Sequence, residues 1–395
     1  MRGRSPIVCV CGTRPEAIKL APVVNALRSR GHRLSIIATG QHPDLAPAML
    51  REAGLQADVD LGLHQPGASP AQMLAAILAS LSPVLAAIRP ALALVQGDTV
   101  SALGGALAAF YAKVPVAHVE AGLRTLNREE PFPEEAHRCL IAPIADLHFA
   151  PTARAVDALL REGVDAASVH LSGNSGIDAV LATAARLAAD AGLQAILQAR
   201  FPFVQAAQKP LILVTVHRRE NIGPRLASIA AALARLASFC EAEIVLPLHP
   251  NPAVAAKLKA RLGGMSGVHL LPAVDHATMV WLMQRSRLLL TDSGGLQEEA
   301  PALGLRVLVL RETTERPEAL SCGAATLVSL TADGIVAATR EALAEPPPLP
   351  CYPFGDGLSA PRIAAAIEGW LGIPASDGQW IMPSALPPQG PASGR

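Results

Sequence analysis

Two basic side chains stand beside a predicted helix start near the beginning of the chain. Arg14 and Lys19 lie in the segment GTRPEAIKLAP (12–22), directly after the apolar run 6–11. Pro15 suits the first turn of a helix, because the N–H that proline lacks would have no partner there. Cations beside a helix N-terminus attract an anion through their charge, the helix dipole and the free backbone N–H groups. This segment therefore predicts an anion site.

Acidic side chains follow the next apolar runs in the first half of the chain. Run 92–96 leads into Gly97-Asp98-Thr99, where we expect Asp98 to cap a helix, and run 115–119 leads into Glu120. The segment PFPEEAHR (131–138) then opens another helix with four charged or titratable residues: Glu134, Glu135, His137 and Arg138. Carboxylates grouped with histidine and arginine are suited to general acid–base catalysis.

The second half of the chain repeats this arrangement. Four more apolar runs end in polar segments: 211–216 in His217, 243–248 in His249, 287–291 in Asp292-Ser293-Gly294-Gly295, and 306–310 in RETTERPEAL (311–320), which contains Arg316. The glycine-bearing turn opens a helix that carries Glu298 and Glu299. Cations, carboxylates and histidines thus recur after successive apolar runs in both halves.

Each of these residues also has an ordinary structural role. Asp98 could be only a helix cap, His217 or His249 a structural histidine, and Glu298 and Glu299 part of a solvated helix face. Their positions favour function instead. Because ligands bind beyond the carboxyl ends of parallel strands, polar residues that recur there predict a functional cleft between two domains.

The elements that position these residues follow from the apolar runs. The runs are continuous and do not alternate with polar residues, which is typical of parallel strands covered on both faces. Helical patterns separate them, at 14–30, 70–88, 100–112, 225–239 and 294–303, and an Ala-rich helical segment covers 177–200. We therefore predict an α/β protein of two Rossmann-like, doubly wound parallel-sheet domains facing across a cleft.

The domain boundaries are expected where the two sets of runs separate. Residues 1–175 would form an N-terminal domain that carries the acidic residues, and 176–358 a C-terminal domain. A Pro-rich connector (345–353) leads to a C-terminal helix at 359–373 that would cross back to the first domain. Residues 374–395 are rich in Pro, Ser and Gly and are expected to be a disordered tail.

Composition limits the classes of function. The chain of 395 residues has 33 basic and 33 acidic residues, which argues against a dedicated nucleic-acid or membrane-surface binder. Its six cysteines form no CxxC pair, as expected of a reduced cytoplasmic protein. The apolar run of MRGRSPIVCVCG stops too early for a signal peptide. The uncharged stretch 71–88 is expected to be a buried Ala-rich helix, not a membrane span.

Motifs for metal binding, nucleoside triphosphate binding and serine-hydrolase chemistry are missing from the sequence. We find no HExxH, Walker loop or GxSxG segment. GDGLSA (355–360) fits a loose dinucleotide pattern, but it follows a Pro-rich connector and not the first strand. Asp58-Val59-Asp60 resembles a metal-binding DxD without a supporting ligand cluster. We therefore expect no metal and no cofactor.

Taken in order, the motifs resemble those of the non-hydrolysing UDP-N-acetylglucosamine 2-epimerases. The matching segments run from about residue 6 to 372 and include GTRPEAIKLAP (12–22), TGQH (39–42), GDT (97–99), PVAHVEAGLRT (115–125), PFPEEAHR (131–138), GNSGIDA (173–179), VTVHRREN (214–221), LPLHPNP (246–252), LTDSGGLQEEAPALG (290–304), RETTERPEAL (311–320) and PFGDG (353–357). The resemblance implies a fold like that of the GT-B glycosyltransferases. It also implies interconversion of UDP-GlcNAc and UDP-ManNAc without a redox cofactor, for surface polysaccharide synthesis, by a homodimer.

The resemblance also implies roles for particular residues. The acidic catalytic set would be Asp98, Glu120 and Glu134, with His217 as the catalytic-site histidine. The other matched residues would bind substrate: Arg14, Lys19 and Arg138 the diphosphate or the sugar, Ser293, Gly294 and Gly295 a phosphate, Glu299 the ribose, with His249 and Arg316 as further binding residues. The segment 64–71 lacks the Arg that many relatives use in a second, activating substrate site, and Asp44 follows TGQH.

The implied reaction needs this kind of residue set. The C2 proton of GlcNAc has no adjacent carbonyl, so we expect UDP to leave C1 as C2 loses its proton, and to add back after the proton returns to the other face. This requires a base, an acid and groups that stabilise departing UDP. Crowding of Asp98, Glu120 and Glu134 should raise the pKa of at least one of them. A hydrolysing epimerase, an epimerase of another UDP-sugar, a GT-B glycosyltransferase and a non-catalytic UDP-sugar sensor remain alternatives.

Overall fold

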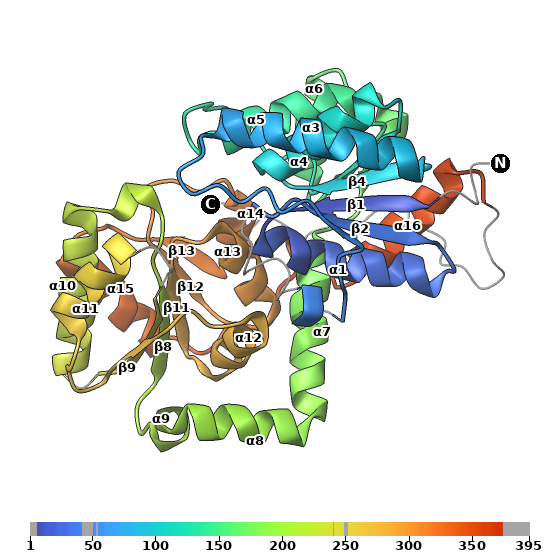
Figure 1. Ribbon diagram of the computed structural model, residues 1–395. Coiled ribbons are helices and arrows are strands. Elements are labelled where there is room, and N and C mark those ends of the chain that lie inside the picture. The colour runs from blue at the N-terminus through green and yellow to red at the C-terminus, as the bar shows by residue number, and fades with distance from the viewer. Residues whose placement is uncertain (1–5, 42–49, 53, 240, 249–251, 374–395) are drawn as a thin grey trace, which may run out of the picture.

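A computed structural model describes residues 6–41, 50–52, 54–239, 241–248 and 252–373 of the chain. It contains two parallel β-sheets, each flanked by helices, which lie side by side (Figure 1). The predicted fold class, two Rossmann-like α/β domains in a GT-B-like arrangement, is confirmed. His249 and the tail 374–395 lie outside the described residues.

The first sheet has seven strands in the order β3-β2-β1-β4-β5-β6-β7. The strands are β1 (Ile7–Cys11), β2 (Leu34–Ala38), β3 (Val59–Asp60), β4 (Leu92–Gln96), β5 (Val116–Val119), β6 (Leu147–Ala150) and β7 (Val169–Leu171). The strand order reverses between β1 and β4, which pair in register from Ile7 with Leu92. In a doubly wound sheet this is the place where a ligand crevice forms.

The second sheet has six strands in the order β10-β9-β8-β11-β12-β13. The strands are β8 (Leu211–Thr215), β9 (Glu243–Pro247), β10 (Val268–Leu271), β11 (Leu288–Thr291), β12 (Val307–Val309) and β13 (Ala325–Leu327). Its order reverses between β8 and β11, so it repeats the topology of the first sheet around its own crevice.

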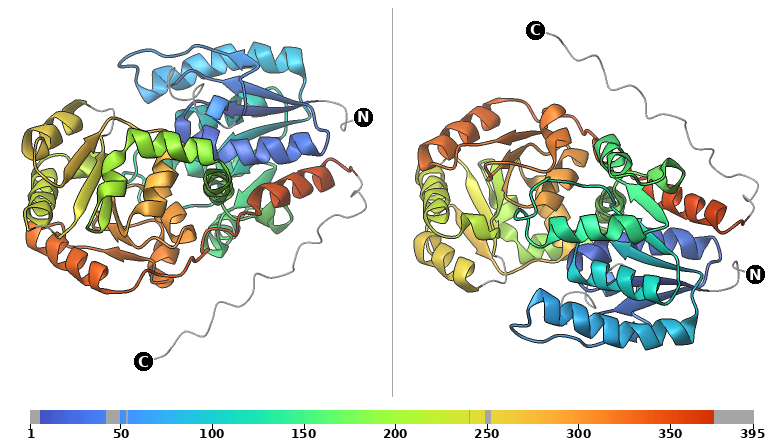
Figure 2. Two further views of the ribbon diagram at one scale, coloured as in Figure 1. Left: turned by 90° about the horizontal axis from the view of Figure 1, so that it is seen from below. Right: turned by 90° about the horizontal axis from the view of Figure 1, so that it is seen from above.

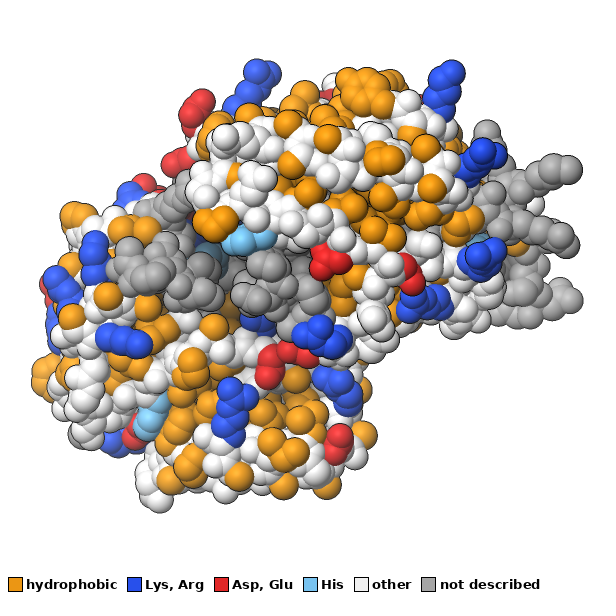
Figure 3. Space-filling view, viewed as in Figure 1, with side chains coloured by type: hydrophobic (Ala, Val, Ile, Leu, Met, Phe, Trp, Pro, Cys, Tyr) orange, Lys and Arg blue, Asp and Glu red, His pale blue; other side chains and the backbone are white. Residues whose placement is uncertain are grey.

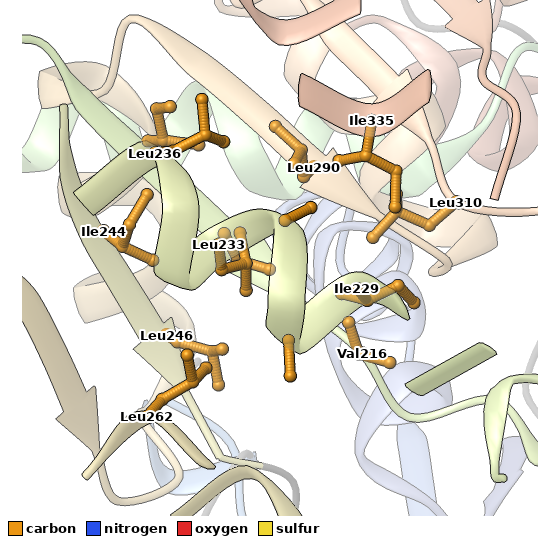
Figure 4. Packing of buried hydrophobic residues seen from close by; sticks show 14 of the residues in the cluster. Val216, Ile229, Leu233, Leu236, Ile244, Leu246, Leu262, Leu290, Leu310 and Ile335 are labelled. Atoms are coloured by element: carbon orange, nitrogen blue, oxygen red, sulfur yellow. The ribbon is translucent and has the colours of Figure 1, made fainter. Parts of the chain in front are cut away.

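Helices cover both faces of each sheet. In the first half they are α1 (Arg14–Ser29), α3 (Pro70–Ile88), α4 (Val100–Tyr111), α5 (Glu134–Ile141) and α6 (Ala153–Arg161). In the second half they are α8 (Ala191–Arg200), α9 (Pro202–Ala206), α10 (Pro224–Ser238), α11 (Pro252–Leu262), α12 (His276–Arg285), α13 (Gly294–Ala302), α14 (Pro317–Ser321) and α15 (Ala332–Ala344). Figure 4 shows one such layer, in which Leu233 and Leu236 of α10 pack toward Ile244 and Leu246 of β9.

Helix α3 corrects one expectation from the sequence. Within the described residues it is the one unbroken helix whose length and composition would suit a membrane span. Its buried residues are Met73, Ile77, Leu81 and Leu85, which recur every four residues and form a single stripe that packs beside α4. The helix was expected to be buried, but only this stripe is, because α3 forms the outer layer of its half and small residues such as Ala and Ser line its other face.

The chain crosses between the halves twice, and the two crossings touch. The first leads into α7 (Ser175–Ala189), and the second leads from Phe354 into α16 (Ser359–Trp370). The backbone N–H of Asn174 donates to the carbonyl of Phe354 at 2.6 Å. Asp178 of α7 accepts hydrogen bonds from the backbone N–H groups of Ser359 and Ala360, at 3.2 and 2.8 Å, and so caps α16.

The two crossing helices join different cores: Ile177 and Val180 of α7 lie in a cluster of the second half, and α16 lies in the core of the first half. Ile363, Ala364 and Ile367 of α16 are buried in the same core cluster as residues of α1, and Figure 2 shows α16 running beside α1 in both views. The Ala-rich segment 177–200 is two helices and not one, because α7 and α8 meet at a bend of 94°. Asp190 lies at that bend in extended backbone and caps α8 through the N–H of Leu193.

Candidate active site

The loop after β1 is held in place by a buried glutamate. Glu16, in the first turn of α1, accepts hydrogen bonds from the backbone N–H groups of Gly12 and Thr13 at 3.0 and 2.7 Å. Its other oxygen accepts from the Thr99 hydroxyl at 2.7 Å. Glu16 therefore joins the ends of β1 and β4 at the crevice of the first sheet. Burial raises the pKa of this carboxyl to about 7, although these hydrogen bonds oppose the rise.

Lys19 and Glu120 form a buried ion pair at the carboxyl end of the first sheet. Lys19 is on α1 and Glu120 directly follows β5. The same Glu120 oxygen also accepts from the side-chain amide of Gln96 at 2.7 Å. Glu120 has a φ of +64°, a left-handed conformation that is uncommon for a residue with a side chain and that often marks a functional site.

Asp98 and Arg138 form a second ion pair next to the first. Asp98 was expected to cap α4, but the cap is Thr99, whose hydroxyl accepts from the Ala102 N–H at 3.0 Å. This leaves the Asp98 carboxylate to Arg138. The Asp98 backbone carbonyl contacts Nδ1 of His137 at 2.7 Å, which fixes the loop against α5.

The expected rise of a carboxyl pKa within the acidic set does not occur at Asp98. Burial by itself would raise the pKa of Asp98, but Arg138, Lys19 and Arg316 outweigh it and lower the pKa. Asp98 and Glu120 each lie against a cation. Because Arg316 belongs to the second half, its effect on Asp98 also shows that the two halves bring their charged residues together.

Glu134 and Glu135 differ sharply although they are neighbours. Glu135 is buried and accepts from the backbone N–H groups of Thr125 and Leu126, both at 3.0 Å, so it has a structural role. Glu134, at the start of α5, is partly exposed, and no hydrogen bond or ion pair of its side chain occurs among the described residues. Its carboxylate is therefore available to a ligand.

His217 is oriented by a buried aspartate of the second sheet. Nδ1 of His217 lies 3.0 Å from an oxygen of Asp292, whose side chain is fully buried. Asp292 also accepts from the backbone N–H groups of His217 and Arg218, and from the Asn221 amide at 2.9 Å. These bonds join the end of β8 to the end of β11 and fix the His217 ring against the second sheet.

The turn Ser293-Gly294-Gly295 forms the N-terminus of α13, as predicted from the sequence. Ser293 is the cap residue, and its side chain accepts no hydrogen bond from the helix. A Cβ on Gly294 would lie 2.6 Å from the guanidinium of Arg316, so only glycine lets this cation approach the helix end. The Ser293 N–H donates to the Thr291 hydroxyl at 2.9 Å. The N–H groups of Gly294 and Gly295, with an arginine beside them, suit a phosphate.

Arg316 belongs to a buried network that spans the two halves. Its Nε donates to Glu298 at 2.6 Å, and its guanidinium also pairs with Glu315. Glu298 accepts in turn from the side-chain amide of Asn174, the residue at the first crossing, and that amide also contacts Glu120 at 3.4 Å. The predicted phosphate residue is therefore connected to the predicted acidic set through two side chains.

The remaining predicted residues lie around this network. Arg14 reaches across to the second half and donates to the carbonyl of Val274 at 2.8 Å. Burial raises the pKa of the Glu299 carboxyl to about 7, against the charges of Lys19 and Arg14. The structure thus gathers nine of the predicted residues: Arg14, Lys19, Asp98, Glu120, Arg138, Gly294, Gly295, Glu299 and Arg316. Among the described residues no contact joins Glu134 to them, and His217 is held by Asp292.

Sequence reasoning missed the residues that position the others. They are Glu16, Gln96 and Asn174, together with Asp292 and Glu298, which the sequence places after a strand but to which it assigns no positioning role; all five lie in or next to the motifs quoted above. Each is a polar residue within an apolar run or at a helix start, and that is a signal of a buried hydrogen-bonding role. The sequence could not name their partners, which are often distant, as Asn174 and Glu298 are. Among the described residues, no three His, Cys, Asp or Glu side chains gather as a metal site would require.

Comparison with known proteins assigns the chain to a family. The family model described as UDP-N-acetylglucosamine 2-epimerase matches residues 25–368. The chain belongs to this family. The UDP-N-acetylglucosamine 2-epimerase of Salmonella typhimurium is 41% identical over 371 residues, which cover 92% of this chain and 98% of that protein.

Solved structures agree with the family assignment. The UDP-GlcNAc 2-epimerase of Neisseria meningitidis bound to UDP-GlcNAc is 36% identical, with a TM-score of 0.86 over 92% of this chain and 100% of that one. The enzyme of Methanocaldococcus jannaschii in complex with UDP-GlcNAc and UDP is 31% identical, with a TM-score of 0.81 over 92% of this chain and 99% of that one.

Proposed function

We propose that the protein interconverts UDP-N-acetylglucosamine and UDP-N-acetylmannosamine without hydrolysing them. The observation that carries this proposal is the meeting of two ion pairs, Lys19–Glu120 and Asp98–Arg138, with a phosphate-type helix end and Arg316 from the other half. Acid–base groups thus lie next to a site for an anionic leaving group. The relatives whose structures contain UDP-GlcNAc support the choice of substrate.

The reaction we propose is an elimination followed by an addition. One carboxylate of the set Asp98, Glu120 and Glu134 takes the C2 proton, the electrons of that bond form the C1–C2 double bond, and UDP leaves C1. A second group then protonates C2 from the opposite face while UDP bonds to C1 again. General acid–base groups at such positions contribute about 10²–10⁴-fold each to a rate.

Retention of UDP is what separates this reaction from hydrolysis. We assign the phosphates to the N–H groups of Gly294 and Gly295, to the Ser293 hydroxyl and to Arg316, the ribose to Glu299, and a catalytic role to His217. Arg14, Lys19 and Arg138 would neutralise the diphosphate or contact the sugar, and His249 would complete the binding set. Contacts between the halves, such as that of Arg14 with Val274, support a closed state of the protein. In this state water would be kept from the unsaturated sugar that forms when UDP leaves.

We also propose a homodimer that forms through the outer face of the first half. The aromatic residues Phe110 and Tyr111 at the end of α4 are 52% and 71% exposed, and Leu140 of α5 is 55% exposed. Apolar side chains gather over α3 and its neighbours in Figure 3. A second copy of the chain would bury this face. Changing both Phe110 and Tyr111 to Glu should halve the mass measured by light scattering.

The cellular setting is part of the same proposal. A nucleotide-sugar substrate, the absence of a CxxC framework and the balanced charge favour the cytoplasm, with no nucleic acid or membrane as partner. UDP-ManNAc would supply ManNAc to surface polysaccharide synthesis. We propose that residues 1–175 and 176–358 are the two domains and that the helix 359–373 returns to the first. These two domains would close on the substrate.

Proton NMR of the purified protein with UDP-GlcNAc in deuterium oxide tests the proposal. We expect UDP-ManNAc to appear with deuterium at C2 and with only traces of free UDP, without added metal or nicotinamide. Stoichiometric UDP and free ManNAc would identify a hydrolysing enzyme. Binding of UDP-GlcNAc without any exchange at C2 would refute the proposal and leave another UDP-sugar, a glycosyl transfer or a sensor.

A further inference from the structure

Two cysteines outside the candidate active site lie in direct contact. The Sγ atoms of Cys322 and Cys351 are 2.8 Å apart, although the residues are 29 positions apart in the chain. Cys322 ends helix α14, and Cys351 lies on the connector between α15 and α16. Closing this distance to the ~2.05 Å of an S–S bond requires a movement of roughly 0.8 Å.

The other described cysteines do not share these features. Cys9 and Cys11 are fully buried in β1, and burial raises the pKa of the Cys9 thiol to about 12. Burial likewise raises the pKa of Cys139, which has no sulfur partner among the described residues. Cys322, by contrast, is exposed, and Cys351 is partly exposed, so a small reagent in solution can reach this pair.

The chemistry of the pair is asymmetric. The two sulfurs share a hydrogen bond in which either thiol can be the donor, and this bond lowers the pKa of Cys322 to about 6. The same interaction raises the pKa of Cys351. A thiolate is the species that attacks disulfides, and a neighbouring thiol can resolve the mixed disulfide that forms. Because Cys322 is also the more exposed of the two, it is placed as the attacking residue and Cys351 as the resolving residue.

We propose that Cys322 and Cys351 are a modification site that low-molecular-weight disulfides oxidise reversibly to an intramolecular disulfide. The Cys322 thiolate attacks one sulfur of the reagent, forms a mixed disulfide and releases one thiol. Cys351 then loses its proton and attacks Sγ of Cys322, which releases the second thiol. Two protein thiols are oxidised, one reagent disulfide is reduced, and the atoms and electrons balance.

The bond would attach the return crossing to the second half. The backbone N–H of Cys351 already donates to the carbonyl of Pro301 near the end of α13, at 3.0 Å. Cys322 closes the short helix that starts after Arg316. Oxidation would therefore add a covalent link between α14 and the connector that leads to α16. This site is independent of the proposed epimerase reaction, since none of its atoms contacts the candidate catalytic residues.

The test is titration of the full-length protein with oxidised glutathione, followed by counting of thiols after denaturation. The chain has six cysteines, and we expect two of their thiols to be lost and to return with dithiothreitol. Trypsin cleaves after Arg340, between the two cysteines, so the link should join two adjacent tryptic peptides. The reaction rate should rise with pH around a midpoint of about 6.

Single variants separate the two roles. Cys351→Ser should stop at one glutathione bound to Cys322. In Cys322→Ser the remaining Cys351 thiol should react with oxidised glutathione more slowly than Cys322 does in the wild type. Cys139→Ser is the matched control and should still form the link. Loss of two thiols that persists in both Cys322→Ser and Cys351→Ser, or no joined peptides in the wild type at any glutathione ratio, would overturn the proposal.

Discussion

The two halves of the molecule have the same strand order, but different residues follow their strands. After β4 and β5 of the first sheet come carboxylates, Asp98 and Glu120, and each lies against a cation. After β11 and β12 of the second come a glycine turn and Arg316, which is held by two carboxylates. The first half supplies carboxylates that are paired with cations. The second half supplies an arginine that is held by carboxylates, and a helix N-terminus.

This difference shows how one architecture supplies two kinds of site. Both halves bury charged groups, and a buried charge is tolerated only with a partner. In the first half the partner keeps a carboxylate ionised, as the lowered pKa of Asp98 shows. In the second half Glu298 and Glu315 fix the position of Arg316, so that it lies over Gly294. We therefore expect mutations in the first half to affect mainly kcat and those in the second mainly substrate binding.

The largest expected effect is that of Asp98→Asn. The change removes the carboxylate and nearly preserves its shape, so kcat should fall about 10³-fold while KM changes little. Steady-state kinetics with UDP-GlcNAc measure both constants. Asp157→Asn, on the exposed face of α6, is the matched control and should retain full activity. A rise in KM at unchanged kcat would mean that Asp98 binds substrate. It would contradict the proposal that the first half acts mainly on kcat and the second mainly on binding.

The next effect is that of Asp292→Asn, the exception in the second half, because it should act on kcat through the catalytic-site histidine His217. Asparagine would turn an N–H group toward donors that now bond the Asp292 carboxylate, so His217 would lose its orientation. We expect kcat to fall about 10²-fold. If Asp292 acts through His217, combining it with His217→Asn should add little to the loss from His217→Asn alone. Additive losses would mean that Asp292 has a separate role.

The sequence predicted most of the strands that are buried on both faces. All eight predicted runs, which include 34–39, contain a strand, since continuous apolar residues such as those of β1 and β8 have few other places to lie. Five short strands were missed: β3, β7 and β13 have only two or three residues and are partly exposed, whereas β6 and β10 have four residues and each contains a histidine that interrupts the apolar run. Their pairing comes from the neighbouring strand and not from their own composition.

The sequence also located most of the candidate site but not its pairing. That Lys19 would meet Glu120 depends on how the chain winds from β1 through β2, β3 and β4 to β5, because 101 positions separate the residues. The cap of α4 was assigned to Asp98, whereas the neighbouring Thr99 fills it. Both residues suit a cap equally well in isolation. The competition was decided by Arg138, which holds the Asp98 side chain elsewhere.

A smaller effect is expected from Gly294→Ala in the second half. The new methyl group would lie 2.6 Å from the Arg316 guanidinium, which its two carboxylate partners hold in place. Overpacking of this kind costs about 1–2 kcal/mol, so the Kd of UDP should rise about 10-fold, with a smaller change in kcat. Calorimetric titration with UDP measures this Kd. Gly369→Ala is the control, since a Cβ there meets no atom within 4 Å; equal losses in both variants would contradict the steric argument.

The smallest effect is the pH dependence of substrate binding through Glu299. Burial raises the pKa of its carboxyl to about 7, so the group is protonated below that pH and ionised above it. The ionised form accepts two hydrogen bonds from a ribose diol, whereas the protonated form keeps less acceptor capacity. Because UDP-GlcNAc itself does not titrate in this range, its KM should fall about threefold between about pH 6 and 8.

In Glu299→Gln this pH dependence of KM should vanish. Glu312→Gln, an exposed change in the same half, should keep it. A KM that rises with pH in the wild type would mean that repulsion between Glu299 and the diphosphate outweighs the ribose contact, and the ribose would then need another acceptor.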